Sequence, residues 1–126
     1  MIVREYKDED IPELIRMRFD FTAETKTVDL ALFEPFQSEC LDFFREIKES
    51  GRWKIWVAEV EGRIVSHIYL EIVDTVPRPG RKKSPWGYVT NVYTVPDYRG
   101  RGIGLGKRWR IILHHEWSGG SGGGWN

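Results

Sequence analysis

The sequence predicts one mixed α+β domain, built as an antiparallel sheet of about four strands with flanking helices. The 126 residues are 40% hydrophobic and 13% aromatic, which suffices for one modest core and is short for two. Apolar segments rich in β-branched and aromatic residues fill the middle of the chain, and segments with helical periodicity precede and follow them. The fold class is predicted from this order of segments.

The N-terminal half predicts a strand followed by two helices. Residues 2–6 are short and partly β-branched, as in a strand. Asp10 precedes Pro12, which suits the first turn of a helix. One face of this helix is expected to carry Ile11, Leu14, Ile15, Arg18 and Phe19. The polar residues 22–30 predict a loop, and a second helix is expected from about 36 to 48, ended by Ser50 and Gly51.

The segments 53–60 and 63–73 predict a β-hairpin around Glu61 and Gly62. Alternation divides its second arm into two faces, one expected in the core and the other amphipathic: Ile64, Ser66, Ile68, Leu70 and Ile72, against Val65, His67, Tyr69 and Glu71. Residues 74–85 are rich in proline and basic residues and predict a loop. Residues 86–95 predict a further strand, and residues 102–117 predict a helix.

Composition limits the classes of function. Lys plus Arg equals Asp plus Glu at 19 each, so no global field recruits nucleic acid or an anionic membrane. A single cysteine, Cys40, permits no disulfide within the chain, and no cluster of Cys and His predicts a metal site. No segment resembles a signal peptide or a bilayer span. We therefore expect a cytoplasmic protein without a metal and without a membrane partner.

A glycine-rich stretch, TVPDYRGRGIGLGKRWR at 94–110, follows the last predicted strand and opens the last predicted helix. Backbone N–H groups at such a turn can converge on an anion, and glycine lets the ligand approach the backbone. A Walker A loop is excluded, because Arg101 stands where glycine is required and Arg108 where Ser or Thr is required. A dinucleotide fingerprint is excluded as well, because its last glycine would fall on Leu105 or Lys107.

The spacing that remains, Arg99-x-x-Gly102-x-Gly104 after VYTVPDY, resembles the acyl-CoA-binding segment of the GNAT superfamily of N-acetyltransferases. The element order over residues 1–117 agrees with that family. The resemblance implies transfer of an acetyl group from acetyl-CoA to a primary amine of a small molecule or a protein. It further implies pairing of the pantetheine arm of coenzyme A with the backbone of Val92, Tyr93, Thr94 and Val95. The amides that would cradle the pyrophosphate are those of Arg99, Gly100, Arg101, Gly102, Ile103, Gly104 and Leu105.

The catalytic residues stay unassigned at this level. Amide formation from a thioester needs a base for the amine, a donor for the oxyanion and an acid for the thiolate. Family members often carry a carboxylate base on the fourth strand, where this chain has Thr90 and Asn91. The candidates are Asn91 itself and, acting through water, Glu71 and Tyr69; a solvated strand position is the competing interpretation for Glu71. His67 is expected to be a packed or surface histidine rather than a base.

The C-terminal end departs from the family pattern. Members continue with a fifth strand, a helix that bears a general-acid tyrosine, and a closing hairpin, whereas residues 118–126, SGGSGGGWN, have the composition of a flexible linker. We expect residues 1–117 to be the N-terminal portion of an acyl-CoA N-acyltransferase domain, followed by a Gly/Ser-rich tail. An open sheet edge and an uncovered helix would then favour a homodimer.

Two other interpretations remain open. The chain could bind coenzyme A or associate with itself without catalysing a reaction. Alternatively, RGRGIGLGKRWR at 99–110 could bind RNA through arginines and an aromatic residue, although zero net charge argues against nucleic acid.

Overall fold

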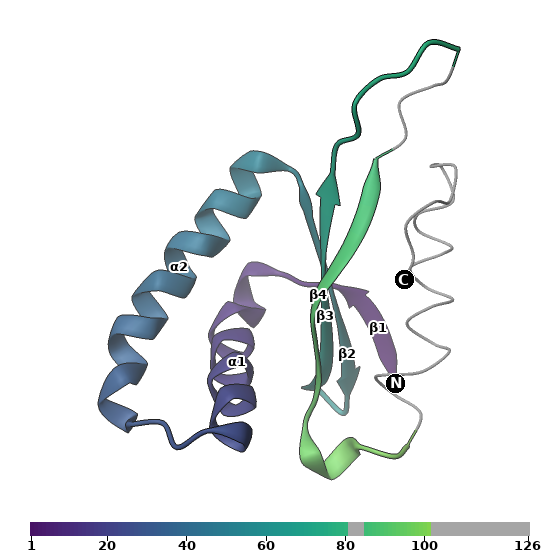
Figure 1. The fold of residues 1–126 in the computed structure, drawn as a ribbon. Helices are drawn as coiled ribbons and strands as arrows, with labels where there is room; N and C mark the ends of the chain where they lie inside the picture. The colour runs from purple at the N-terminus through teal and green to yellow at the C-terminus, as the bar shows by residue number, and fades with distance from the viewer. Residues whose placement is uncertain (81–84, 102–126) are drawn as a thin grey trace.

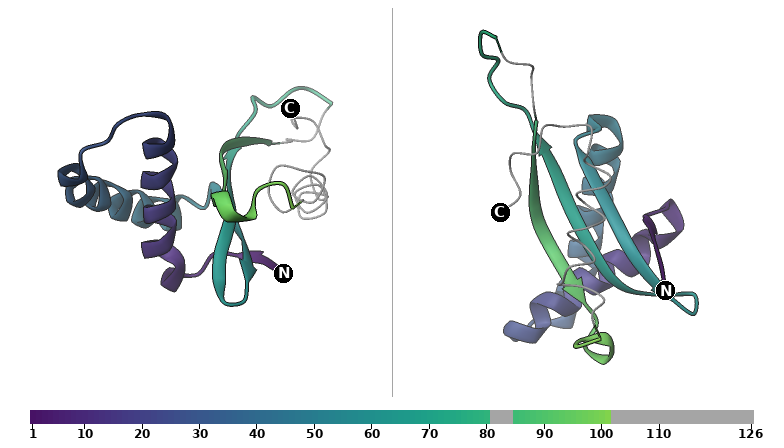
Figure 2. Two further views of the ribbon diagram at one scale, coloured as in Figure 1. Left: turned by 90° about the horizontal axis from the view of Figure 1, so that it is seen from below. Right: turned by 90° about the vertical axis from the view of Figure 1, so that its right-hand side faces the viewer.

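The computed structural model describes residues 1–80 and 85–101. In this part of the chain the sheet is antiparallel with the order β1-β2-β3-β4. Its strands are β1 Ile2–Glu5, β2 Trp53–Val60, β3 Arg63–Val73 and β4 Trp86–Thr94. The helices α1 Ile11–Thr25 and α2 Phe33–Ser50 lie on the same face of the sheet (Figures 1 and 2). Short 3-10 turns occupy Asp8–Asp10, Leu30–Leu32 and Pro96–Tyr98. The predicted α+β class is confirmed.

Both helices are longer than the sequence predicts. The loop expected at residues 22–30 begins only after Thr25, and in this last helical part the threonine hydroxyls bond to carbonyls of the preceding turn. Thr22 Oγ1 donates to the Arg18 carbonyl at 3.3 Å, and Thr25 Oγ1 donates to the Thr22 carbonyl at 3.3 Å. The start of α2 at Phe33 rather than near residue 36 has a tertiary cause, since the Phe33 ring packs edge-on against Phe19 of α1.

The predicted end of α2 is confirmed at Gly51, which caps the helix with φ of +64°. The hairpin between β2 and β3 is confirmed as well, and its turn residues Glu61 and Gly62 both have positive φ. The prediction that one face of β3 is amphipathic is wrong. Positions 64–70 are buried on both faces, including the polar Ser66 and His67 at 0% exposure. The nearly continuous apolar run of β3 matches the burial of alternate side chains on both faces of the sheet.

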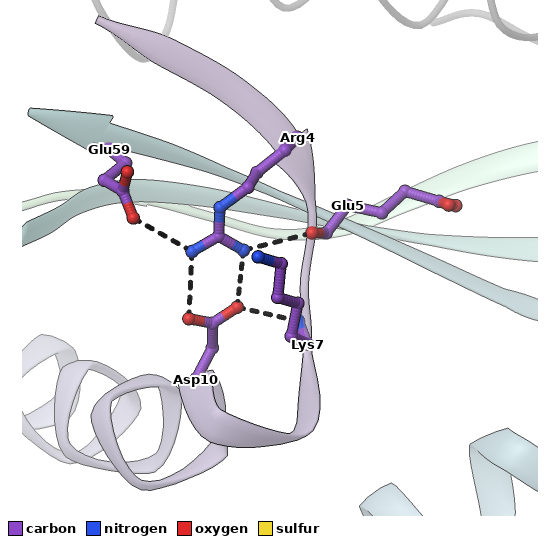
Figure 3. A network of polar contacts seen from close by, with 5 residues as sticks. All are labelled: Arg4, Glu5, Lys7, Asp10 and Glu59. Carbon is purple, nitrogen blue, oxygen red and sulfur yellow. Dashed lines mark hydrogen bonds and ion pairs between the residues drawn. The ribbon is translucent and has the colours of Figure 1, made fainter. Parts of the chain in front are cut away.

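A charged network ties β1 to the start of α1 and to β2 (Figure 3). The Arg4 guanidinium donates to both carboxylate oxygens of Asp10, at 2.7 and 3.0 Å, and to Glu59 Oε1 at 3.1 Å. Asp10 also accepts the Lys7 backbone N–H at 2.7 Å. The Arg4 guanidinium lowers the pKa of Asp10, against an opposing effect of burial. This network fixes where α1 starts relative to the sheet.

The helix predicted over 102–117 and the tail at 118–126 lie outside the described residues. None of the helices in the described ranges combines the length and apolarity that a membrane-spanning helix needs.

Candidate functional site

The outer edge of β4 carries backbone groups that point away from the sheet. Val95 N–H donates to the Val65 carbonyl at 2.9 Å, and Tyr93 lies opposite His67. In an antiparallel ladder alternate residues face opposite sides, so the backbone groups of Val92 and Thr94 are directed away from β3. The Thr94 carbonyl accepts a hydrogen bond from Arg99 Nε at 2.9 Å. Val92 is therefore the position from which a ligand could extend the sheet.

The turn after β4 is held by its own hydrogen bonds and by α1. Arg99 N–H donates to the Pro96 carbonyl at 3.2 Å, and Gly100 has φ of +78°. The Arg99 guanidinium binds both carboxylate oxygens of Glu24 at 2.6 and 2.9 Å and lies 5.4 Å from the Tyr93 ring centroid. Arg99 thus joins the end of α1 to the end of β4, which is a positioning role that its place in the motif did not indicate.

Two further arginines lie close to one aromatic ring at this turn. Arg101 lies 4.9 Å and Arg63 lies 5.7 Å from the Tyr98 ring centroid. Arg63 was missed at the sequence level, because it belongs to the start of β3 and only the strand pairing brings it here. Gly102, Ile103, Gly104 and Leu105, the remaining residues of the predicted pyrophosphate cradle, lie outside the described residues.

A bulge interrupts β4 beside this edge. Tyr69 pairs with Asn91 and Leu70 pairs with Val89, so Thr90 is an extra residue that has no partner position on β3. Bulges occur often beside active sites because they redirect a side chain and end regular pairing. Thr90 and Asn91 are the two residues that the sequence resemblance places at the position of a carboxylate base.

A cavity of about 280 Å³ lies between the two helices and the sheet, next to the bulge. Its described lining is aromatic and aliphatic with few polar groups: Leu14, Ile15, Arg18, Phe36, Cys40, Phe43, Phe44, Trp53, Tyr69, Thr90 and Asn91. The Asn91 Oδ1 atom is buried and has no hydrogen-bond partner in the described part of the chain. Buried polar atoms are nearly always satisfied, so this oxygen is a candidate for contact with a ligand.

The titratable groups of the cavity stay protonated near neutral pH. Burial raises the pKa of the Tyr69 hydroxyl and of the Cys40 thiol, and in each case the charge of Arg18 opposes the effect. Glu71 lies two residues beyond Tyr69 on β3 and is not among the lining residues. Of the three predicted candidates, Tyr69 and Asn91 therefore reach the cavity, and neither is a base in its resting state. Among the described residues, no group of three or more His, Cys, Asp and Glu side chains could hold a metal ion.

His67 is a packed histidine between two tyrosines. It is fully buried, with ring centroids 5.1 Å from Tyr69 and 5.9 Å from Tyr93, and neither ring nitrogen has a hydrogen-bond partner within residues 1–80 and 85–101. Burial, assisted by the charge of Arg18, lowers its pKa to about 3. The imidazole is neutral at physiological pH and does not line the cavity.

This pKa makes stability depend on pH. Below pH 6.5 the imidazole of His67 becomes protonated in the unfolded chain. In the folded chain it stays neutral until about pH 3. The free energy of unfolding is therefore expected to fall by about 1.4 kcal/mol per pH unit from pH 6.5 to 5 on account of this residue. Urea denaturation of the protein and of His67→Gln at several pH values measures it. Equal pH slopes for the two proteins would contradict the assignment.

Comparisons with known proteins agree with this geometry. The acetyltransferase (GNAT) family matches residues 14–105, which is more than half of the chain. No curated protein matches the chain. A predicted acetyltransferase from Clostridium acetobutylicum, solved with acetyl-CoA, superposes with a TM-score of 0.69 at 22% identity, over 94% of this chain and 73% of that one.

Two further solved structures share the fold. A GCN5-related N-acetyltransferase from Ralstonia eutropha has a TM-score of 0.68 at 24% identity, over 95% of this chain and 78% of that one. AAC(6')-Iy, in complex with the bisubstrate analogue CoA-S-monomethyl-acetylneamine, has a TM-score of 0.64 at 14% identity, over 94% and 71%. The element order, the glycine-containing turn after β4 and the extent of the family match lead to one conclusion: the chain belongs to the acetyltransferase (GNAT) family.

Proposed function

We propose that the chain transfers the acetyl group of acetyl-CoA to the primary amine of a small-molecule acceptor. The observation that carries the proposal is the adjacency, on one strand, of an outward-facing edge at Val92 and a cavity reached by Thr90 and Asn91. The turn at 96–101 follows β4, so a cofactor with its pyrophosphate there and its pantetheine arm along Val92 would bring its thioester to the bulge. The acetyl-CoA and CoA-analogue complexes of two structural neighbours support this donor.

In the proposed reaction, groups of β4 and of the cavity would lie near the reacting atoms of the amine and the thioester. The amine nitrogen in the cavity attacks the thioester carbonyl carbon, the C–S bond breaks, and the sulfur leaves as the thiol of coenzyme A after taking a proton. The bulge at Thr90 interrupts the ladder to β3, and a backbone N–H of β4 near it would stabilise the oxyanion. The described lining supplies no carboxylate, so the amine loses its proton to water.

Titration calorimetry with acetyl-CoA and a thiol-release assay with primary amines test the proposal. We expect saturable binding of acetyl-CoA and amine-dependent release of coenzyme A. Binding without release for any amine would favour a non-catalytic CoA-binding module. Absence of binding, together with salt-sensitive binding of RNA, would favour the nucleic-acid interpretation. The homodimer and the cytoplasmic location remain predictions from the sequence.

A further inference from the structure

The cavity beside the bulge carries a positive charge, which is unusual for a pocket that would receive an amine. Among its described lining residues Arg18 is the one charged group, and there is no Asp or Glu. The Arg18 guanidinium stands 5.5 Å from the Phe21 ring centroid, and no carboxylate of the described chain pairs with it. By contrast, Arg4, Arg16 and Arg99 each have a carboxylate partner. A positive group at an apolar pocket selects a ligand with a negative group.

The charge of Arg18 reaches residues at the cavity and beside it. Burial dominates the pKa values of Cys40, His67 and Tyr69, and the charge of Arg18 acts on all three in the direction that a nearby cation must. Arg18 is exposed and lines the cavity together with Cys40 and Tyr69, so its guanidinium stands on the solvent-facing side of this space. A ligand cation placed there would be repelled without compensation from a lining carboxylate.

The apolar lining and the volume of the cavity limit the polarity and the size of the ligand. Phe43 packs edge-on against Trp53 at 5.2 Å and lies parallel to Tyr69 at 6.5 Å, which gives the pocket a rigid aromatic wall. A volume of about 280 Å³ lies at the lower end of the ~300–1,000 Å³ typical of ligand pockets. One aromatic ring or a branched aliphatic chain fits such a space, whereas an oligosaccharide does not.

The end of the pocket at the bulge offers a contact for the amine. Asn91 Oδ1 is buried, has no partner among the residues that the structure describes, and can only accept a hydrogen bond. An N–H of the acceptor amine would satisfy it, next to Thr90 and one residue from the Val92 edge. The amine would then lie at the point where the thioester of a bound cofactor is expected.

We propose that the acceptor is a small primary amine that also carries a carboxylate and an apolar body, of which an α-amino acid with an aromatic or branched aliphatic side chain is the simplest case. The inference rests on the proposed function. Arg18 binds the carboxylate, the aromatic wall receives the side chain, and Asn91 accepts from the amine. The product is the N-acetylated amino acid plus free coenzyme A. Polycationic acceptors are disfavoured, in contrast to the neamine portion of the analogue bound by AAC(6')-Iy.

A matched set of amines tests the proposal by thiol release. L-Phenylalanine and phenethylamine differ by the carboxylate alone, and spermidine represents the polycations. We expect kcat/KM for L-phenylalanine to exceed that for phenethylamine by about 10- to 100-fold, the usual effect of a hydrogen bond to a charged group. Arg18→Gln should bring the ratio of kcat/KM for L-phenylalanine to that for phenethylamine close to one. Arg16→Gln is the control, since Arg16 is exposed on the same helix and is absent from the lining.

A binding measurement separates this inference from the proposed function. 3-Phenylpropionate has the carboxylate and the ring but no amine, so it should bind without turnover, and Arg18→Gln should weaken it about tenfold or more in calorimetric titration. Turnover of phenethylamine or spermidine at or above the rate for L-phenylalanine would overturn the inference and leave the proposed function standing. Failure of acetyl-CoA to bind, with Arg18-dependent binding of 3-phenylpropionate, would overturn the proposed function and leave a carboxylate-binding pocket.

Discussion

Asp10→Asn is expected to lower the free energy of unfolding by about 3 kcal/mol at pH 7. The substitution keeps the shape of the side chain but removes the charge that accepts two hydrogen bonds from Arg4. The side chains of Arg4 and Asp10 are only 20% and 10% exposed, so water cannot replace the lost contact fully. Glu59 alone then balances the guanidinium. Urea denaturation at pH 7 measures the change.

Asp42→Asn is the matched control for this substitution. Asp42 pairs with Arg45 on the outer face of α2, and both side chains are mostly exposed, at 64% and 73%. Its loss should change the free energy of unfolding by less than about 0.5 kcal/mol. The pKa of Asp10 is lowered by Arg4, so its contribution is present above the unfolded pKa of about 4 and disappears as pH falls through the folded pKa. The deficit of Asp10→Asn should therefore shrink in acid, and a deficit that is constant from pH 7 to 3 would contradict an ionic origin.

Val92→Pro is expected to weaken acetyl-CoA binding by about 10- to 100-fold. Proline removes the N–H that faces away from β3, and a ligand carbonyl left without its donor loses about 1–3 kcal/mol. The ladder to β3 survives, because Asn91 and Tyr93 rather than Val92 pair their backbone groups with β3. Titration calorimetry gives the affinity, and circular dichroism shows whether the sheet is intact.

Val3→Pro provides the control on the opposite edge of the sheet. Tyr6 N–H donates to the Ile55 carbonyl, so by alternation the N–H of Val3 also faces away from its neighbouring strand. The same chemical change is thus made at an edge strand far along the sheet from β4 (Figure 1). Acetyl-CoA affinity should be unchanged in Val3→Pro. Equal loss in both variants would mean that proline disturbs the sheet and not a cofactor contact.

Much of the fold could be predicted from local patterns. Gly51 and Gly62 mark chain reversals with positive φ, which glycine adopts more readily than other residues, and Glu61 before Gly62 has positive φ as well. The errors occurred where tertiary contacts outweighed propensity. Phe33 is helical because it packs on Phe19, and both faces of β3 are buried although their composition differs. Helix and strand propensities have a smaller effect on local structure than burial of this kind.

Some residues of the candidate site could likewise be predicted from the sequence, whereas the role of others depends on the tertiary structure. Thr90 and Asn91 could be singled out in advance because they occupy the position at which a carboxylate is usual in the resembling family. Their chemical role depends on the one-residue bulge, which becomes visible only when β3 and β4 are paired. Arg18 was placed on the apolar face of α1 with no function, and its role follows from the cavity beside it.

The order of elements, the turns and the spacing from Arg99 to Gly104 that resembles the GNAT family can be predicted from the sequence, because each of these depends on residues close together in the chain. Which side chains meet depends on the tertiary fold. Arg99 binds Glu24 across 75 positions, Arg4 binds Glu59 across 55, and Arg18 lines one cavity with Tyr69 and Asn91. Such contacts result from strand register and helix packing, which are set by burial of the whole core and which no short stretch of sequence encodes.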